Sequence, residues 1–440
     1  MSNMNIPNDP IMLFSFINTQ LRDNYSSLTE LVKSYSADEE DIKGKLAAAG
    51  YRYDEEKNQF VKKTIISRDV LDEEGKKIYS IDYSDGFDEL SDFLQNYNPD
   101  KQKKVCIVSD SHVASIYLEE MTKLCEKYFA KVVSFVFPEG EASKNLDTVR
   151  EIYVKLIEEK FTRKDVLLAL GGGVTGDMCG YTAATFLRGI DFIQVPTSLL
   201  ADVDSSIGGK TGVDFDSYKN MVGAFHMPVN VYINTATLDT LSRRQLYSGM
   251  GEVVKMALIR GDDGFYSWLE ENISKVNETP LDRSFTSKVL DFSNQKKADI
   301  VAEDPHEMKG VRELLNFGHT LGHAIEKFMD FELLHGECVH IGCILACIIS
   351  RNKGMIGQEL VDDVASLILD NMEVPKIGDK IKGEAIDRVI ELTHSDKKAV
   401  GASIKYVLLE GVGKAVIRTD VSDEDMKAAL VEYIQKYESK

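Results

Sequence analysis

The feature that most constrains the fold is an alternation of short, apolar, β-branched runs with helical stretches between residues 104 and 198. The runs are "KVCIVSD" (104–110), "KVVSFVF" (131–137), "DVLLALGG" (165–172) and "FIQVPTS" (192–198). Parallel strands need long, usually helical crossovers and are buried on both faces, so they are apolar throughout. The alternation therefore predicts a mostly parallel α/β domain, which we place at residues 63–240.

The segments on either side of this domain are predicted to be helical. Residues 241–440 form a second large domain, in which "IKYVLLE" (404–410) is the main strand-like run. A chain of 440 residues exceeds one ordinary core, so two large domains are expected. Ligands commonly bind between such domains, and we expect the site there. A hairpin around "DEEG" (72–75) is predicted at the start of the α/β domain.

Residues 1–62 read as a separate small helical appendage. Helices are expected in residues 9–25, capped by Asp9, and in residues 26–36 and 37–51, before a ribbon in "YRYDEEKNQFV" (51–61). Short helices joined in this way resemble a helix-turn-helix. Because "ADEEDIKGK" places acids where a recognition helix needs bases, a protein-interaction or folding role is preferred to nucleic-acid binding.

Composition excludes several classes of partner. The formal net charge of −20 argues against nucleic acid and anionic membranes, so an anionic substrate would need a locally basic pocket. The most apolar run, "VHIGCILACII" (339–349), is too short to span a bilayer, and the first ten residues lack a signal-peptide profile. Six cysteines without a CxxC pair fit reduced core thiols, which favours a cytoplasmic protein.

A glycine-rich turn follows the third predicted strand. Gly171, Gly172 and Gly173 lie between an apolar run and a helix start, where backbone amides can approach a diphosphate. The spacing is not GxGxxG, so a tight strand-to-helix turn without a ligand is the alternative. "PEGEASK" (138–144) and "PTSLLADVDSS" (196–206) also follow predicted strands, which gathers their polar residues at the same edge of the sheet.

Basic and amide side chains gather in two further segments. "VDSSIGGKTG" (203–212) and "YKN" (218–220) place Asp204, Lys210, Lys219 and Asn220 on what we predict to be glycine-rich loops. Lysine and asparagine beside flexible backbone suit recognition of phosphate or carboxylate; solvated loop lysines are the alternative. Arg188 lies between an apolar helix and an apolar strand, where a purely structural arginine is disfavoured.

A histidine pair marks the helical domain. "LLNFGHTLGHAIE" (314–326) places His319 and His323 on one helix face, although a core pair would look the same. "SGMGEVVKMAL" (248–258) adds Glu252 and Lys255 in the first turns of a helix. "LLHGECVHIG" (333–342) adds His335 ahead of another helix. A buried carboxylate is costly unless paired or metal-bound, and nitrogen and oxygen ligands favour zinc or a similar ion.

These motifs, in this order and spacing, resemble the 3-dehydroquinate synthase family of sugar-phosphate cyclases. The likeness runs from about residue 64 to the C-terminus, while residues 1–62 resemble a small bacterial domain of unknown function. It implies an NAD-binding Rossmann-like domain followed by a helical metal- and substrate-binding domain. It also implies a homodimer, because the family's equivalent of Arg188 can reach into a neighbouring subunit.

The resemblance further implies the role of each site residue. The metal, Zn²⁺ or Co²⁺, would be held by Glu252, His319 and His335. Catalytic roles would fall to His323, Glu307, Lys210 and Lys255. NAD would be bound by Asp110, Glu141, Lys144, Gly172, Gly173, Val174, Asp177, Thr197, Ser198, Lys219, Thr237, Leu238 and Thr240. The substrate would be bound by Arg188, Asp204, Lys210, Asn220, Lys255, Lys297, Arg312, Asn316 and Lys397 or Lys398.

The implied reaction converts 3-deoxy-D-arabino-heptulosonate 7-phosphate to 3-dehydroquinate and phosphate, a step of the shikimate pathway. It proceeds by transient NAD-dependent oxidation, phosphate elimination, reduction, ring opening and aldol cyclisation, so the enzyme is a lyase without net redox change. Other sugar-phosphate cyclases and metal-dependent polyol dehydrogenases of the glycerol type are the alternatives. The many bases and the Arg312–Asn316 pair favour a substrate with both phosphate and carboxylate. A binding protein with an idle cyclase domain is a third alternative, which the intact ligand set disfavours.

Overall fold

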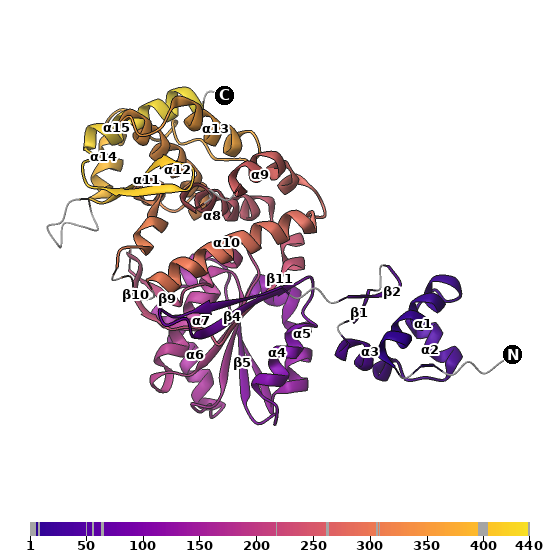
Figure 1. Ribbon diagram of the computed structural model, residues 1–440. Coiled ribbons are helices and arrows are strands. Elements are labelled where there is room, and N and C mark those ends of the chain that lie inside the picture. The colour runs from indigo at the N-terminus through magenta and orange to yellow at the C-terminus, as the bar shows by residue number, and fades with distance from the viewer. Residues whose placement is uncertain are drawn as a thin grey trace. The chain divides into compact units, whose positions relative to one another are not determined.

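The computed structural model describes residues 6–7, 9–49, 51–54, 57–62, 66–216, 218–260, 264–304, 307, 309–394 and 404–438. Contacts divide the chain into two units, residues 1–66 and 67–440. The predicted fold class is confirmed: a mostly parallel α/β sheet and a helical part follow a small helical segment (Figure 1).

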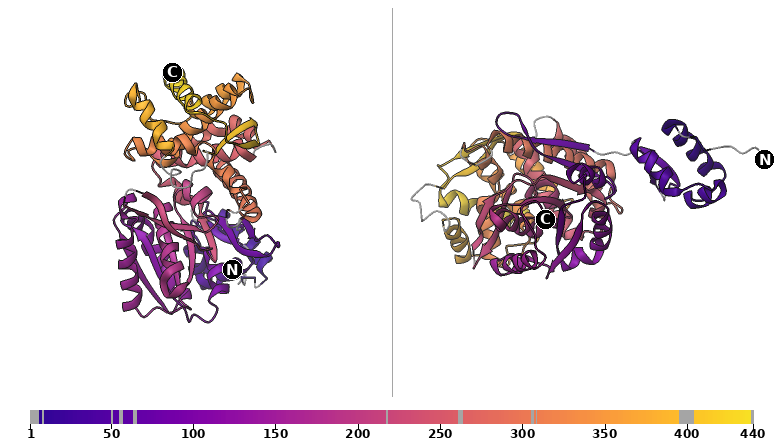
Figure 2. Two further views of the ribbon diagram at one scale, coloured as in Figure 1. Left: turned by 90° about the vertical axis from the view of Figure 1, so that its left-hand side faces the viewer. Right: turned by 90° about the horizontal axis from the view of Figure 1, so that it is seen from below.

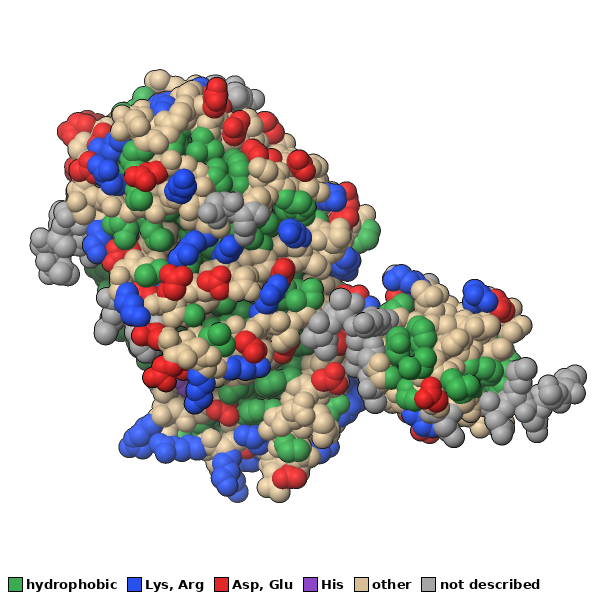
Figure 3. All heavy atoms as spheres, viewed as in Figure 1, with side chains coloured by type: hydrophobic (Ala, Val, Ile, Leu, Met, Phe, Trp, Pro, Cys, Tyr) green, Lys and Arg blue, Asp and Glu red, His purple; other side chains and the backbone are tan. Residues whose placement is uncertain are grey.

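The N-terminal unit is built from three helices and a two-stranded ribbon, as predicted. They are α1 (Pro10–Asp23), α2 (Leu28–Tyr35), α3 (Glu39–Ala48), β1 (Tyr51–Asp54) and β2 (Gln59–Lys62). Asp9 caps α1 by accepting from the amides of Ile11 and Met12, which confirms the predicted cap. The side chains of Ile11 and Met12 are 71% and 62% exposed, and the unit shows apolar surface in Figure 3. Exposed apolar side chains of this kind suit protein contacts better than nucleic acid.

The larger unit contains a seven-stranded sheet in the order β3-β4-β11-β8-β7-β5-β6. Its strands are β3 (Ile66–Leu71), β4 (Lys77–Ser84), β5 (Lys104–Asp110), β6 (Lys131–Phe137), β7 (Val166–Gly171), β8 (Asp191–Pro196) and β11 (Asn230–Asn234). The pairs from β4 to β6 are parallel. The predicted hairpin is also present, because β3 and β4 are neighbours joined by a turn over residues 72–76.

Helices cover both faces of this sheet, and alternate strand residues are buried against them. The helices are α4 (Leu90–Tyr97), α5 (Ser111–Tyr128), α6 (Leu146–Glu158) and α7 (Gly173–Thr185). In β5, Cys106 and Val108 pack toward α6 and α7, whereas Val105 and Ile107 pack toward α4 and α5. Because side chains alternate with period 2, both faces need apolar residues, and this is why the run is continuously apolar.

The strand order creates a switch point between β5 and β7. The chain leaves β5 for β6 on one side and then returns to β7 on the other side. At such a point the loops after the two strands diverge, and a crevice opens at their carboxyl ends. Asp110 ends β5 and the glycine turn follows β7, so the two predicted nucleotide-binding segments flank this switch point. Short helical turns η1 (Glu141–Ser143), η3 (Ala201–Ser205) and η4 (Thr235–Asp239) follow β6, β8 and β11, whereas η2 (Phe186–Arg188) follows α7.

A separate antiparallel hairpin, β9 (Lys210–Phe215) and β10 (Tyr218–Phe225), carries three of the predicted anion-binding residues. We expected Asp204, Lys210, Lys219 and Asn220 on glycine-rich loops, and this was wrong. Asp204 lies in η3, Lys210 pairs with Phe225 across the hairpin, and Lys219 and Asn220 lie within β10, at the register shift between Tyr218 and Val222. Gly212 and Gly223 allow the close approach, since a Cβ at either residue would meet the backbone of the opposite strand.

The rest of the larger unit is a helical bundle, which lies at the carboxyl edge of the sheet (Figures 1 and 2). Its elements are α8 (Arg243–Arg260), α9 (Phe265–Asn272), η5 (Ile273–Asn277), α10 (Arg283–Glu303), η6 (Arg312–Asn316), α11 (His319–Phe328), α12 (His335–Asn352), α13 (Gln358–Leu369), α14 (Glu384–Thr393), β12 (Tyr406–Gly411), β13 (Lys414–Arg418), α15 (Asp423–Glu432) and η7 (Tyr433–Tyr437). The predicted strand "IKYVLLE" is β12, but its partner β13 was not expected. Among the described residues, no helix is long and apolar enough to cross a membrane.

Helices α8 and α12 cross where Gly336 faces Ser248 and Gly251. A Cβ at Gly336 would overlap the carbonyl oxygen of Ser248, and a Cβ at Gly251 would lie 2.6 Å from the carbonyl oxygen of Gly336. The Gly336 amide also donates to Ser248 Oγ at 3.1 Å. Glu252 follows Gly251, and His335 precedes Gly336. The backbone contact therefore brings these two candidate ligands together.

Gly336→Ala is expected to force α8 and α12 apart and to lower the free energy of unfolding by about 1–3 kcal/mol. Calorimetry should show a lower melting temperature for the larger unit. Gly86→Ala is the control, because its Cβ would meet only Glu89 Oε2 at 3.8 Å, an ordinary contact. Equal melting temperatures for the two variants would contradict the close-packed crossing.

Candidate active site

Glu252, His319 and His335 meet between three helices of the bundle. Glu252 lies in the middle of α8, and the two histidines begin α11 and α12. Glu252 Oε1 lies 3.6 Å from His319 Nε2 and 3.4 Å from His335 Nε2. We predicted that Glu252 lies in the first turns of its helix and His335 ahead of its helix. Both helices begin earlier than the apolar runs suggested.

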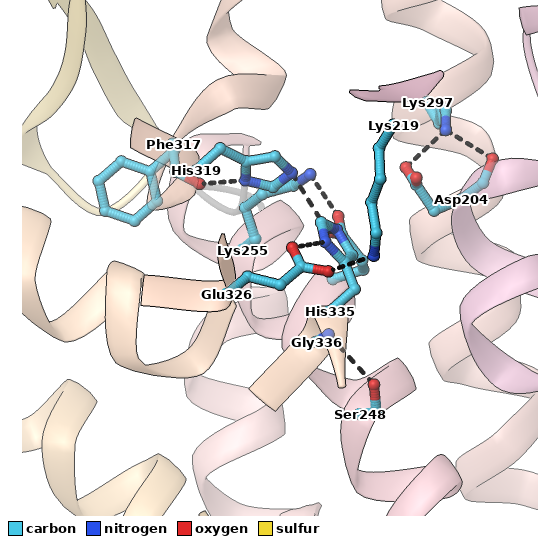
Figure 4. A network of polar contacts seen from close by, with 11 residues as sticks. Asp204, Lys219, Ser248, Lys255, Lys297, Phe317, His319, Glu326, His335 and Gly336 are labelled. Carbon is cyan, nitrogen blue, oxygen red and sulfur yellow. Dashed lines mark hydrogen bonds and ion pairs between the residues drawn. The ribbon is translucent and has the colours of Figure 1, made fainter. Parts of the chain in front are cut away.

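The second ring nitrogen of each histidine, Nδ1, donates a hydrogen bond to an oxygen. His319 Nδ1 donates to the carbonyl oxygen of Phe317 at 3.1 Å, and His335 Nδ1 donates to Glu326 Oε2 at 3.4 Å (Figure 4). A protonated Nδ1 leaves the Nε2 lone pair free to bind a metal. Both lone pairs are on the side of Glu252, which is the arrangement of a histidine–carboxylate metal site.

Glu252 is a buried charge that the surrounding protein compensates only in part. Its side chain is 2% exposed, and neither carboxylate oxygen has a hydrogen-bond partner among the described residues. Its ion pair is with Lys255, one turn along α8, whose side chain is equally buried. Burial alone would raise the pKa of Glu252, but the charge of Lys255 and the contact with His335 lower it. An ionised carboxylate with unfilled oxygens facing two imidazoles fits a divalent cation.

His323 is also close to these ligands, so the geometry allows a second set. The ligand nitrogens of His319, His323 and His335 lie within 4.8 Å of one another. The ring centres of His319 and His323 are 4.9 Å apart on one face of α11, as predicted. His323 differs from the other two because its side chain is exposed. The three-histidine set and the predicted set of Glu252, His319 and His335 therefore share two members.

The three histidines differ in how readily they take up a proton. Burial, followed by the nearby charges of Lys255 and His323, lowers the pKa of His319. Partial burial of the His323 ring and the charge of the adjacent His335 lower the pKa of His323 to about 4, so this ring is neutral near pH 7. Burial also opposes charge on His335, but its contacts with the carboxylates of Glu252 and Glu326 outweigh it and raise the pKa to about 9.

Glu326 is a site residue that the sequence reasoning left unassigned, although it stood in the quoted motif. It follows His323 by three residues and His319 by seven, so all three lie on one face of α11. The signal that could have found it is an acid at helical spacing in an apolar segment. Its carboxylate accepts from His335 on α12 and from Lys219 on β10, at 2.8 Å.

The sheet edge presents a surface suited to a nucleotide. Gly172 is the N-cap of α7, without a side-chain cap, and Val174 lies in the first turn of this helix. A Cβ on Gly172 or Gly173 would press against Ser198 or Ser205, so glycine keeps the backbone amides accessible. Thr197 and Ser198 follow β8, and the Thr197 amide donates to the carbonyl of Gly171 at 3.1 Å.

Asp110 and the turn after β11 also lie at the carboxyl edge. Asp110 Oδ1 accepts from the amides of His112 and Val113 and thereby caps α5. Thr240 Oγ1 bonds Tyr117 at 2.6 Å. Thr237 and Leu238 are buried, and their carbonyl oxygens accept from the amides of Thr240 and Leu241.

Lys144 joins two of the predicted groups. Its buried ammonium donates to Asp177 Oδ2 and to Asn220 Oδ1, both at 2.6 Å, and Glu141 Oε1 is 4.0 Å away. Burial opposes the charge on Lys144, but Asp177 and Glu141 outweigh it and raise the pKa of the amine. Lys144, which is predicted to bind the cofactor, therefore directly orients Asn220, which is predicted to bind the substrate.

Three further cations point into the region between sheet and bundle. The ammonium of Lys297, on α10, donates to two oxygens of Asp204, on η3: the backbone carbonyl oxygen and Oδ1, both at 2.5 Å (Figure 4). Burial lowers the pKa of Lys297, although Asp204 opposes the shift. Lys210 pairs with Glu307. Arg312 is buried and donates from Nη2 to the carbonyl of Gly208 at 3.4 Å, and Asn316 ends the same short turn, η6.

One predicted substrate contact, Arg188, is not brought to this region. Arg188 ends η2, just before the amino end of β8, whereas Thr197 follows its carboxyl end. A six-residue strand is about 20 Å long, so Arg188 is at the opposite edge of the sheet. Lys397 and Lys398 lie outside the described residues.

Fold and site together define a class of two-domain proteins. In this class a nucleotide-binding type of sheet edge faces a helical bundle that carries a histidine–carboxylate centre. The family profile of the 3-dehydroquinate synthase N-terminal domain matches residues 134–248, and that of the C-terminal domain matches residues 249–399. The chain belongs to the 3-dehydroquinate synthase family, as its motifs predicted. Residues 7–60 match a domain of unknown function, DUF4250.

Curated and solved relatives agree with this assignment. A 3-dehydroquinate synthase of Nitrosospira multiformis is 43% identical over 332 residues, covering 75% of this chain and 88% of the relative. A 2-deoxy-scyllo-inosose synthase solved with carbaglucose-6-phosphate, NAD⁺ and Co²⁺ has a TM-score of 0.72 at 25% identity, covering 83% and 99% of the two chains. A 2-epi-5-epi-valiolone synthase from Streptomyces hygroscopicus subsp. jinggangensis, with NAD⁺ and Zn²⁺ bound, has a TM-score of 0.74 at 25% identity, covering 81% and 97%.

Metal affinity is expected to rise with pH, because a metal must displace the proton from His335. With a metal-free pKa of about 9, His335 is protonated below that pH, and the dissociation constant for Co²⁺ should fall about tenfold per pH unit between pH 6 and 8. Calorimetric titration in two buffers of different ionisation enthalpy would count the released protons. A dissociation constant independent of pH in this range would contradict the assignment.

Proposed function

We propose that this chain is a 3-dehydroquinate synthase, which converts 3-deoxy-D-arabino-heptulosonate 7-phosphate to 3-dehydroquinate and phosphate. The observation that carries the proposal is the convergence of three sets of groups. These are the nucleotide-type sheet edge, the buried Glu252 with its two histidines, and a group of buried or paired lysines and arginine between them. The substrate carries both phosphate and carboxylate, and such a group of cations compensates that charge within an acidic protein.

The cofactors are NAD⁺ and a divalent ion, Zn²⁺ or Co²⁺, which supply a hydride acceptor and a Lewis acid. Glu252, His319 and His335 would hold the ion through one oxygen and two Nε2 atoms. The glycine turn after β7 would hold the diphosphate at the start of α7, helped by the amide-rich helix N-terminus. The remaining predicted NAD residues would complete the cofactor site, with Lys219 on β10, where it pairs with Glu326.

The substrate is proposed to be bound by side chains that already form ion pairs with one another. Lys297 and Asp204 form one pair and Lys210 and Glu307 another, so each lysine is held in place before substrate arrives. Arg312, which is buried against Gly208, would offer its planar guanidinium to the carboxylate. Holding both anionic ends in a fixed geometry favours the later ring closure by orientation.

His323 is proposed to move a proton rather than bind the metal. Its exposed ring lies next to the two histidine ligands, and its lowered pKa keeps it neutral and able to accept a proton. Lys255, by contrast, is held as a cation by Glu252, which raises its pKa against the effect of burial. It would therefore stabilise negative charge on the substrate.

Arg188 supports the proposal of a homodimer. Its side chain is at the far edge of the sheet from the site of its own subunit, so it can contact substrate only in a neighbouring copy.

We also propose a cytoplasmic location, since all six cysteines are buried free thiols. We propose that residues 63–240 form a nucleotide-binding domain and residues 241–440 a metal- and substrate-binding domain. Residues 1–62 are proposed to contact another protein.

Incubation with the heptulosonate phosphate, a catalytic amount of NAD⁺ and Co²⁺ tests the reaction. One phosphate should be released per substrate, with 3-dehydroquinate as product and no accumulation of NADH. Net NADH formation from glycerol or another polyol would instead favour a polyol dehydrogenase. Turnover of a phosphorylated sugar without a carboxylate, and not of the heptulosonate, would favour another sugar-phosphate cyclase.

His323→Ala is expected to retain bound metal and to lose turnover by about 10²–10⁴-fold, because a proton carrier is removed and the ligands remain. Glu252→Gln should lose both metal and turnover. Elemental analysis of the dialysed variants distinguishes the two ligand sets. A metal-free His323→Ala protein together with a metal-loaded Glu252→Gln protein would support the three-histidine set.

A further inference from the structure

Glu326 connects the two halves of the proposed active site through one buried carboxylate. Its side chain is 5% exposed, on the face of α11 that carries His319 and His323. Oε1 accepts from Lys219 Nζ at 2.8 Å, and Oε2 accepts from His335 Nδ1 at 3.4 Å (Figure 4). Lys219 belongs to the hairpin at the sheet edge, and His335 belongs to the metal cluster.

This carboxylate carries a charge that both of its partners stabilise. Burial alone would raise the pKa of Glu326, but His335 and Lys219 together lower it to about 2. A buried charge that lost one of two such partners would be poorly compensated, so both contacts matter. Lys219 is held from a second side as well, because its ammonium lies 4.2 Å from the ring centre of Phe331.

We propose that Glu326 is a positioning residue that couples the metal site to the cofactor-binding hairpin. The proposal rests on the function proposed above. By accepting from Nδ1, Glu326 keeps the proton on that nitrogen and turns Nε2 of His335 toward Glu252. By accepting from Lys219 at the same time, it fixes the ammonium at the place from which it reaches the nucleotide. A metal that holds the imidazole thereby also orders Lys219.

Coupling through a shared carboxylate is reciprocal. Metal should tighten NAD⁺ binding, and NAD⁺ should tighten metal binding by the same factor. In the unsubstituted protein, each ligand is expected to lower the dissociation constant of the other by a factor of about 5 or more. Equilibrium dialysis with Co²⁺ and fluorescence titration with NAD⁺ measure both constants without turnover.

Glu326→Gln is the principal variant. Glutamine keeps the size of the side chain but has one acceptor oxygen, so it can satisfy only one of the two donors. The Co²⁺ dissociation constant should rise about 10–100-fold, as is typical when the outer partner of a metal-binding histidine is lost. The factor by which Co²⁺ tightens NAD⁺ binding should fall to about one.

Glu432→Gln is the matched control. Glu432 is paired with Arg351 at 2.8 and 2.6 Å, and Arg351 is 16 residues, about 24 Å, along α12 from His335. This variant also loses a carboxylate from an ion pair, so it reproduces a general loss of stability. Its melting temperature should fall, while both dissociation constants and the coupling factor should stay at the values of the unsubstituted protein.

Lys219→Met gives an independent test on the more exposed side of the contact. It should weaken NAD⁺ binding and abolish the coupling while leaving metal affinity within about threefold, since His335 keeps Glu326. In the double variant with Glu326→Gln, the two losses of NAD⁺ affinity should not add. Additive losses, or an unchanged coupling factor in Lys219→Met, would overturn the proposal even if Glu326→Gln does not fold.

The same measurements separate this proposal from the proposed function. If the unsubstituted protein binds neither Co²⁺ nor NAD⁺, the proposed function fails. If it binds both and Glu326→Gln binds Co²⁺ equally well, the function stands and the role of Glu326 is overturned.

Discussion

A carboxylate that is 2% exposed lies at the centre of the helical bundle, and burying such a charge costs several kcal/mol unless it is compensated. Around Glu252 the protein places one lysine and two histidines. Lys255 is supplied by the same helix, whereas His319 and His335 come from the starts of two others. The arrangement of α8, α11 and α12 and the glycines that let α8 and α12 touch follow from this one requirement. The carbonyl oxygen of Phe317 and the carboxylate of Glu326 orient the two imidazoles.

The sheet is determined by a different constraint: consecutive parallel strands must be connected by helical crossovers. Because every crossover returns the chain to the same end of the sheet, the polar loops after β5, β6, β7, β8 and β11 all gather at one edge. The bundle lies at that edge (Figure 1). The ion pairs Lys297–Asp204 and Lys219–Glu326 then join the two halves.

Much of the fold could be predicted from periodicity, because burial on both faces of a parallel sheet leaves continuous apolar runs. The four runs between residues 104 and 198 are strands, and the Asp9 cap is present. Helix starts were predicted less well. Polar residues such as Arg243 and Arg244 extend α8 beyond its apolar run, since a helix end may be solvated while the rest is buried. The hairpin β9–β10 was missed because its glycines look like loop residues until the opposite strand is considered.

The candidate site, like the fold, could be predicted only in part. The sequence determines the chemical types of its residues: imidazoles and a carboxylate in apolar segments, glycines after a strand, and lysines beside glycine. Motif order alone also indicated the family. Tertiary structure decided which residues touch, because Glu252 and His335 are more than eighty positions apart and meet only where two glycines cross. It also decided that Arg188 lies at the far edge and that Glu326 contacts both Lys219 and His335. A hydrogen bond depends on distance and direction in space, and a linear pattern of residues specifies neither across separate elements.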